Sequence, residues 1–263
     1  MFAEGTSQLK EQSTTSQAST SSADAGAARK EARLKRFSDA YQFASERIGR
    51  NALQRPPYAR HTMWRNLFML ASTKEQLEQV VELFPKWRDA GKHFSPEDAE
   101  ALVRRCEELD CPKLALQVFG DHPKYGMDLS SAKAARHLLH SLHQSHPLED
   151  TMLLVALWNI YKLPPISSDL ISCAMLTSTC FKHGSQESLL IANEMLPHLQ
   201  KLLAETAPTS VQYPERRVAQ PEKEKAWLTW TLTKIQKALS KQGAEHEWLT
   251  RWRQDSGHAA AAE

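Results

Sequence analysis

LEQVVELF at residues 77–84 returns as KLALQVF at residues 113–119, in register and 35 residues further along the chain. The matched positions are mostly apolar: Val80, Val81, Leu83, Phe84, Phe94 and Ser95 recur as Ala115, Leu116, Val118, Phe119, Leu129 and Ser130. Looser echoes follow in MLLVALW (152–158) and LLIANEM (189–195). A period of this length is typical of helical hairpins that bury their apolar faces only against their neighbours. The repeat therefore predicts an all-α, right-handed solenoid of about four helix-turn-helix units.

The composition is that of an ordinary soluble protein, with 41% hydrophobic and 24% charged residues. Only nine glycines occur, and long alternating runs of β-branched residues are missing, so a sheet-based fold is disfavoured. No apolar run reaches the ~18 residues that span a bilayer. The longest, Met152–Ile160, is better explained as the buried face of a helix. We therefore expect no membrane span.

Local signals set the bounds of the expected helices. The run Ser95-Pro96-Glu97-Asp98 supplies a cap, a proline at the first helical position and two acids at the positive end of the helix dipole. Ser72 or Thr73 is expected to cap the second helix of the first unit, which Gly91 ends. We expect further helices at about 62–71, 96–109, 112–120, 130–144, 148–161, 167–183 and 186–204.

Changes in composition divide the chain into segments. Residues 1–28 are rich in Ser and Thr and are predicted to be a disordered leader, because such a segment buries too little surface to offset its chain entropy. Its Ser and Ala content suggests an organellar presequence, although Glu4 and Glu11 depart from that pattern. The other segments are a basic helical arm (29–60), the repeats (61–205), a proline-containing linker (206–221), C-terminal capping helices (222–255) and a disordered tail (256–263).

The hairpins resemble pentatricopeptide repeats over roughly residues 61–205. The spacing of 35 residues equals that family's repeat length, and LISCAMLTSTCFKHG (170–184) looks like its first helix and the following turn. The resemblance implies an α-solenoid that acts in organellar RNA metabolism or translation, with no catalysis by the repeats. It also implies a location in the mitochondrial matrix.

One position departs from the family members that read RNA by sequence. Those proteins place Asn, Ser or Thr early in the first helix of each repeat. The matching residues here are Arg65, Glu100 and Leu139, and one alignment of the fourth repeat adds Ala174. The chain therefore looks more like the pentatricopeptide-type proteins of mitochondrial ribosomes, in which repeats act as a scaffold and structured RNA is held by charge.

A basic arm is the strongest functional signal. Residues 29–65 hold three acidic side chains and ten basic ones, a net charge of +7 in a chain of net charge +2. Interleaved aromatic residues add rings on which bases can stack. RNA contact, an import signal and a solvated helix face all remain open explanations. The candidate RNA-binding residues are Arg29, Lys30, Arg33, Lys35, Arg36, Arg47, Arg50, Arg55, Arg60 and Arg65.

Histidines and cysteines were weighed as metal ligands. His137, His140, His143 and His146 repeat every third residue, but no Asp, Glu or Cys lies between them to complete a set, so a solvated or partly packed face is favoured over a metal site or a contact with RNA or an acidic partner. The four cysteines lack C-x2-C spacing and are expected to be buried as small apolar residues in a reducing compartment. We expect no metal and no cofactor.

Seven tryptophans suggest core and cap positions. Trp64, Trp87 and Trp158 fall at repeat positions and are predicted to be core residues. The C-terminal set has two open interpretations, sealing of the last hairpin or docking of a partner, because Trp serves in both. These candidate partner-binding residues are Trp227, Trp230, Trp248 and Trp252.

No enzymatic motif was found, neither a phosphate-binding glycine loop nor G-x-S-x-G nor H-E-x-x-H, so catalysis and a small-molecule substrate are not expected. The leading hypothesis is an RNA- and protein-binding scaffold in mitochondrial gene expression, as a ribosomal small-subunit protein or a translation factor. Its partners would be rRNA or mRNA and mitochondrial ribosomal or translation proteins. The alternatives are a protein–protein adaptor, such as a respiratory-complex assembly factor, and an mRNA stability or processing factor.

Overall fold

The computed structural model describes residues 15–50, 52–53, 55–208 and 220–258. Regular structure in these residues is entirely helical, so the all-α prediction is confirmed. None of the described helices combines the length and the apolar character that crossing a membrane requires. The α-helices are α1 (Thr15–Arg47), α2 (Thr62–Leu70), α3 (Lys74–Val81), α4 (Phe84–Asp89), α5 (Pro96–Glu108), α6 (Pro112–Gly120), α7 (His122–Tyr125), α8 (Ala132–Ser145), α9 (Leu148–Ile160), α10 (Leu170–His183), α11 (Gln186–Glu205), α12 (Gln220–Gln242) and α13 (Glu247–Asp255), with a 3-10 turn η1 (Ile166–Ser168) before α10.

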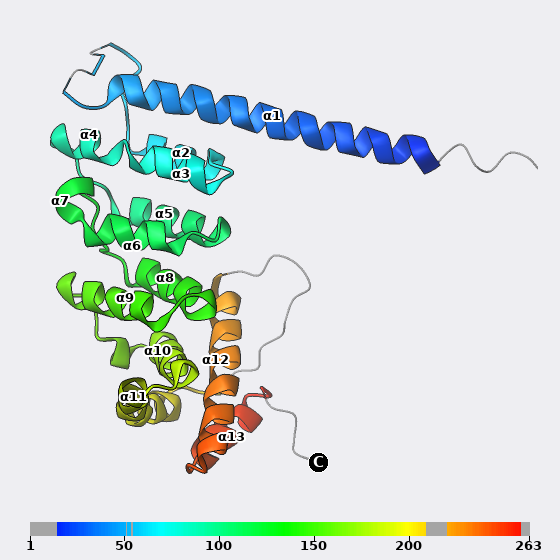
Figure 1. Ribbon diagram of the computed structural model, residues 1–263, viewed down its shortest axis with the longest axis vertical. Helices are drawn as coiled ribbons and strands as arrows, with labels where there is room; N and C mark the ends of the chain where they lie inside the picture. Colours follow the sequence, from blue (N-terminus) through cyan, green and yellow to red (C-terminus); the bar gives the residue numbers. More distant parts are fainter. Residues whose placement is uncertain (1–14, 51, 54, 209–219, 259–263) are drawn as a thin grey trace, which may run out of the picture.

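Consecutive helices pair and then contact the next pair (Figure 1). The pairs are α2 with α3, α5 with α6, α8 with α9 and α10 with α11. The first helices touch in series, α2 on α5, α5 on α8 and α8 on α10, and α6 touches α9 among the second helices. α1 lies across α2 at one end of this series and extends beyond it. Each pair is therefore flanked by neighbours along the long axis of the molecule.

Side-chain caps explain where many of these helices begin. Ser95 accepts a hydrogen bond from the amide of Asp98, whose carboxylate accepts one from the Ser95 amide, which is a capping box. Thr73 caps α3 in the predicted way. The Asp169 and Ser185 side chains accept hydrogen bonds from the third amides of α10 and α11. α10 ends at Gly184, whose φ of 75° is strained for residues with a Cβ.

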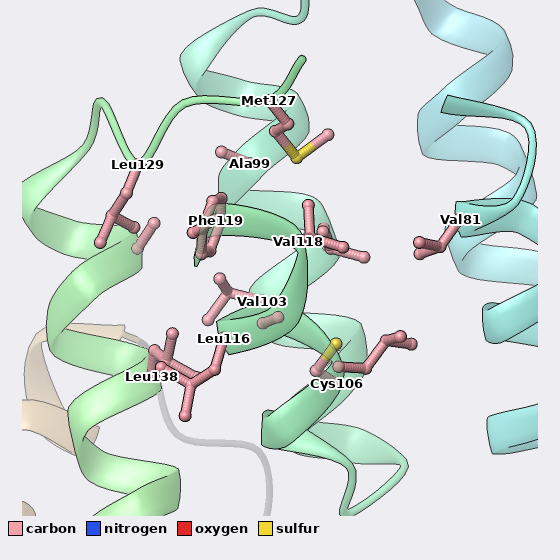
Figure 2. Packing of buried hydrophobic residues seen from close by; sticks show 14 of the residues in the cluster. Val81, Ala99, Val103, Cys106, Leu116, Val118, Phe119, Met127, Leu129 and Leu138 are labelled. Carbon is pink, nitrogen blue, oxygen red and sulfur yellow. The ribbon is translucent and has the colours of Figure 1, made fainter. Parts of the chain in front are cut away.

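The core is continuous from α1 to α10. Trp64 is fully buried, with its ring centroid 5.1 Å from that of Phe84 and 5.5 Å from that of Trp87. Trp158 is also buried and donates a hydrogen bond to the Pro164 carbonyl at 2.7 Å, so all three predicted core tryptophans are confirmed. Burying one such side chain contributes on the order of 1.5–3 kcal/mol. Figure 2 shows apolar residues of α5, α6 and α8 meeting in this core, among them the repeated Leu116, Val118 and Phe119 of α6. The four cysteines are buried and free.

A second cluster joins α10 and α11 to the C-terminal helices. Leu232, Ile235 and Leu239 of α12 are buried against this cluster, to which α13 adds Leu249. α12 does not continue the series of hairpins. It contacts α10 and lies across α8 and α10, the first helices of the last two pairs (Figure 1).

The structure differs from the predicted segments at several boundaries. Residues 15–28 begin α1 and are not a disordered leader, and residues 1–14 lie outside the described part. The predicted linker also falls largely outside it, at 209–219, as does the tail from residue 259. Ser256 is buried, so the start of the predicted tail is ordered. α1 ends at Arg47, and the rest of the predicted arm is a connecting loop followed by α2.

Candidate nucleic-acid interface

The ten candidate RNA-binding residues lie on three consecutive elements at one end of the molecule. Five lie on α1 before the buried Phe37, and Arg47 ends that helix. Three follow in the loop to α2, and Arg65 is on α2 itself. The structure therefore places the predicted basic arm on α1, the loop after it and the start of α2, at one end of the series of hairpins (Figure 1).

Three of these cations have partners within the protein. Arg33 donates hydrogen bonds to the carbonyls of Leu70 and Met69, which lie at the C-terminal end of α2. Arg guanidinium groups suit this position, because the last carbonyls of a helix have no partner in the helix and carry partial negative charge. Arg65 faces the buried carboxylate of Asp98 at 3.8 Å. These two residues bind α1 to α2 and α2 to α5.

Arg47 holds the loop onto α1. Its Nε donates to the Pro57 carbonyl at 3.0 Å, and its guanidinium carbon lies 4.4 Å from the centroid of the Phe43 ring. It also pairs with Glu46 at 3.3 Å. Its side chain is only 13% exposed, so Arg47 has a structural role as well as a charge.

The other seven cations are exposed to solvent, and their side chains make no hydrogen bond or ion pair with the described residues. They divide into a group on α1 and a group in the loop between α1 and α2. Exposed arginine and lysine side chains are the groups that neutralise phosphates. The seven residues are Arg29, Lys30, Lys35 and Arg36 on α1, and Arg50, Arg55 and Arg60 in the loop.

Side chains at the expected base-reading positions face the interior or other side chains. Leu139 and Ala174 are fully buried. Glu100 accepts a hydrogen bond from the Ser131 hydroxyl at 2.7 Å and pairs with Lys133 at 3.2 Å. Because a buried side chain cannot reach a base, Leu139 and Ala174 offer no contact to RNA.

The C-terminal tryptophans make contacts within the protein. Trp227 is buried and stacks on His140, with ring centroids 4.0 Å apart and planes at 18°. Trp252 is buried and donates a hydrogen bond to the Thr206 carbonyl at 3.2 Å. Trp248 packs partly buried against the second cluster. Trp230 is 39% exposed, and Lys234 lies over its ring at 3.2 Å.

The α8 histidines contact two of these tryptophans, and we call this contact the His–Trp seam: His137, His140 and His143 of α8 with Trp227 and Trp230 of α12. The three histidines are buried, so the favoured solvated or partly packed face proves to be a packed one. Burial lowers the pKa of His140 to about 4 and that of His143 to about 3, with nearby Lys234 adding to the shift of His143. Both side chains are therefore neutral near pH 7.

The position of α12 does not follow from the sequence pattern. Arg136 of α8 joins three elements, since it pairs with Asp169 at 2.6 Å and with Glu224 of α12 at 3.0 Å. The one available signal was the three-residue spacing shared by the histidines and by Trp227 and Trp230. Because that spacing is also common on single helices, it did not identify a contact between residues some 90 positions apart.

The described residues also include potential metal ligands and thiols. No group of three or more His, Cys, Asp or Glu side chains in that part of the chain could hold a metal ion. Burial raises the pKa of Cys173 to about 12 and that of Cys180 to about 11, so both remain thiols near pH 7.

A scan against protein-family models, a search of curated proteins and a search of solved structures return no match for this chain.

Proposed function

We propose that this protein is a non-enzymatic helical-repeat scaffold that binds RNA and proteins in mitochondrial gene expression. In this proposal the basic arm, residues 29–65, holds rRNA or mRNA, and the stacked hairpins bind neighbouring proteins. The protein acts in the mitochondrial matrix, as a component of the ribosomal small subunit or as a translation factor. This setting follows from the resemblance to pentatricopeptide repeats.

The observation that carries the proposal is the separation of exposed charge from the body of the molecule. Seven exposed cations lie at one end, on α1 and the loop after it, while the full chain has a net charge of only +2. A phosphate backbone is attracted to such a concentrated cationic surface. The N-terminal end of α1 extends past the hairpins (Figure 1), and the α1 cations at residues 29, 30, 35 and 36 are exposed, so a large ligand reaches them from solvent.

The scaffold part of the proposal is supported by the helix contacts. Contacts run from α2 to α5, α8 and α10 in order, as expected for hairpins stacked in series. We propose a right-handed solenoid of about four units, and the order of contacts and the 35-residue period support the stacking of its hairpins. Such a surface binds extended partners and leaves RNA recognition to the arm.

Recognition of RNA by charge is favoured over reading of a base sequence. The buried Leu139 and Ala174 and the internally bonded Glu100 offer no base-reading set. α12 also covers part of the first-helix face of α8 and α10. An mRNA stability or processing factor that selects a sequence motif through its repeats is therefore the weaker candidate.

A charge-neutralised variant tests the proposal. Replacing the exposed α1 cations, as R29Q/K30Q/K35Q/R36Q, removes up to four phosphate contacts without touching the buried face of α1. Fluorescence anisotropy with a structured RNA, measured over a range of salt, should show weaker binding. The plot of log affinity against log salt should become shallower, because the magnitude of its negative slope should decrease by up to about 3.

A matched variant controls for net charge. R104Q/K237Q/K241Q/R251Q also removes four exposed cations, but from α5, α12 and α13. Its salt slope should stay close to that of the unmodified protein. Equal slopes for all three proteins would show that the exposed cations of α1 do not hold the RNA.

A protein–protein adaptor, such as a respiratory-complex assembly factor, is a second candidate because α9 carries apolar residues on its outer face as well. Leu153 and Ile160 are 48% and 69% exposed, although the helix already buries Leu154 and Leu157. A helix that is apolar on most sides is commonly covered. Absence of RNA cross-links in cells, together with co-purifying proteins, would favour this candidate.

A further inference from the structure

A cleft opens between the C-terminal half of α1, the loop that follows it and the start of α2. Its volume is about 830 Å³, within the range of pockets that hold small organic groups. Its apolar wall consists of rings and aliphatic side chains, among them Phe43, Pro56, Pro57 and Tyr58, with Met63 beside them. The cleft therefore lies within the basic arm and offers flat apolar surfaces.

The polar groups of the cleft lie along one side. Arg60, Thr62 and Asn66 line it and are all exposed to solvent. The Asn66 carboxamide offers hydrogen-bond donors on its nitrogen and an acceptor oxygen. The Thr62 hydroxyl can donate one hydrogen bond and can also accept. These are the groups that bind the edge of a heterocyclic base, while an arginine binds phosphate.

Two contacts fix the shape of the cleft before any ligand arrives. The Arg47 guanidinium lies over Phe43 at 4.4 Å and donates a hydrogen bond to the Pro57 carbonyl at 3.0 Å, so one side chain connects the wall on α1 to the wall in the loop. Ala59 is buried and anchors the loop on its other side. By contrast, Tyr58 is 59% exposed, so its ring remains available to a ligand. A preformed site loses less conformational entropy on binding.

The charge around the cleft selects an anionic ligand. Residues 43–66 include five arginines and a single acid, Glu46, which is paired with Arg47 at 3.3 Å. Arg55 and Arg60 are exposed next to the prolines and Tyr58 in the chain. A ligand with a flat ring and a phosphate on either side matches this combination of stacking surface and cations.

We propose that this cleft binds one unstacked base of a single-stranded RNA segment, with Tyr58 and Phe43 providing the stacking surface and Arg60 contacting the adjacent phosphate. This inference rests on the proposed function, since it names the place in the arm where RNA is held by more than charge. The arm then binds best to RNA that has an unpaired nucleotide, such as a loop, a bulge or an end. Bases in a continuous duplex are stacked on their neighbours and cannot enter the cleft.

Tyr58→Ala tests the cleft because this exposed side chain can be removed with little effect on the core. The probe is a fluorescein-labelled oligouridine of about twelve nucleotides, compared with a strand of the same length and charge that has no bases. Anisotropy should show that Tyr58→Ala weakens oligouridine binding about tenfold. Affinity for the base-free strand should not change, because that strand has only phosphates to offer.

Two further proteins complete the experiment. Tyr58→Phe keeps the ring and should bind both strands as the unmodified protein does. Leu153→Ala removes an exposed apolar side chain on α9, far along the stack, and should also have no effect. Circular dichroism and thermal unfolding of each variant establish that the fold is retained.

The outcomes separate the cleft from the proposed function. If the unmodified protein binds both strands and Tyr58→Ala binds both equally well, the cleft assignment is wrong and the basic arm stands. If Tyr58→Ala weakens both strands by the same factor, the ring is not stacking on a base and the assignment is again wrong. If the unmodified protein binds neither strand nor a structured RNA, both the cleft and the proposed function are overturned.

Discussion

His140 and His143 are neutral near pH 7 because the contact between α8 and α12 excludes water from their rings. The uncharged His140 ring stacks on Trp227. The uncharged His143 ring makes a hydrogen bond of 3.2 Å with the Ser178 hydroxyl. A proton on either ring would place a charge in the seam without a paired anion at hydrogen-bond distance. The side chains that hold α12 in place are therefore sensitive to acid.

The pH dependence of stability follows from these lowered pKa values. Each histidine has a folded pKa below its unfolded value of about 6.5, so the unfolded state takes up protons first as the pH falls. The contribution of the two neutral histidines to stability is fully present above pH ~6.5. It is lost as the pH falls toward their folded pKa values of about 4 and about 3. The expected loss is about 1.4 kcal/mol per pH unit for each histidine.

Urea unfolding at pH 7.5, 6.0 and 5.0 measures this loss. The unmodified protein should lose about 3–4 kcal/mol by pH 5.0, and His143→Gln should lose about half as much, whatever its stability at pH 7.5. Parallel pH profiles for the two proteins would contradict the assignment of a neutral, buried His143.

Helix bounds are the part of the fold that the sequence predicts best. The predicted helix at 112–120 is observed as α6, and those at 62–71 and 96–109 differ from α2 and α5 by one residue at the end. Ser95 and Pro96 specify the start of α5, and Pro112 and Gly120 mark the two ends of α6, whereas α2 has no side-chain cap and is bounded by its apolar pattern. Such signals lie within a few residues of the bound that they set, so they can be recognised without tertiary information.

The start of α1 could not be predicted in the same way. Residues 15–28 have a composition typical of disorder, yet they are helical in the structure. Once the helix is nucleated in the apolar segment around Phe37 and Ala44, each further residue adds a hydrogen bond at little cost, and Ala25, Ala27 and Ala28 favour its extension. Local composition does not report this influence of the neighbouring segment.

The cap of α5 provides a test at the level of the helix. Ser95→Ala removes the hydroxyl that accepts the Asp98 amide hydrogen bond, and the Asp98 carboxylate is itself buried. Chemical denaturation should show a loss of about 1 kcal/mol in the free energy of unfolding. Ser130→Ala, one repeat later and exposed, is the matched control and should change stability by less than about 0.5 kcal/mol. Equal effects of the two substitutions would argue against a capping role.

At the scale of the whole molecule, the repeat period predicts neighbouring contacts but not distant ones. The contacts of α2, α5, α8 and α10 follow from hairpins that each need a neighbour. The return of α12 across α8 and α10 depends on pairs such as His140 with Trp227, which no local pattern connects. For the same reason the charge of the arm is evident from composition, whereas the cleft is not. Phe43 and Tyr58 line the same cleft because the loop lies against α1, where Arg47 binds the Pro57 carbonyl.

The most direct test of the central claim, that the basic arm holds RNA while the hairpins form a scaffold, is ultraviolet cross-linking of the tagged full-length protein in cells. We predict that RNA is recovered with the unmodified protein under denaturing conditions, that the cross-linked peptides come from residues 29–65, and that R29Q/K30Q/K35Q/R36Q recovers several-fold less RNA. Recovery of no RNA above background with the unmodified protein, or cross-links confined to the hairpins, would contradict the claim.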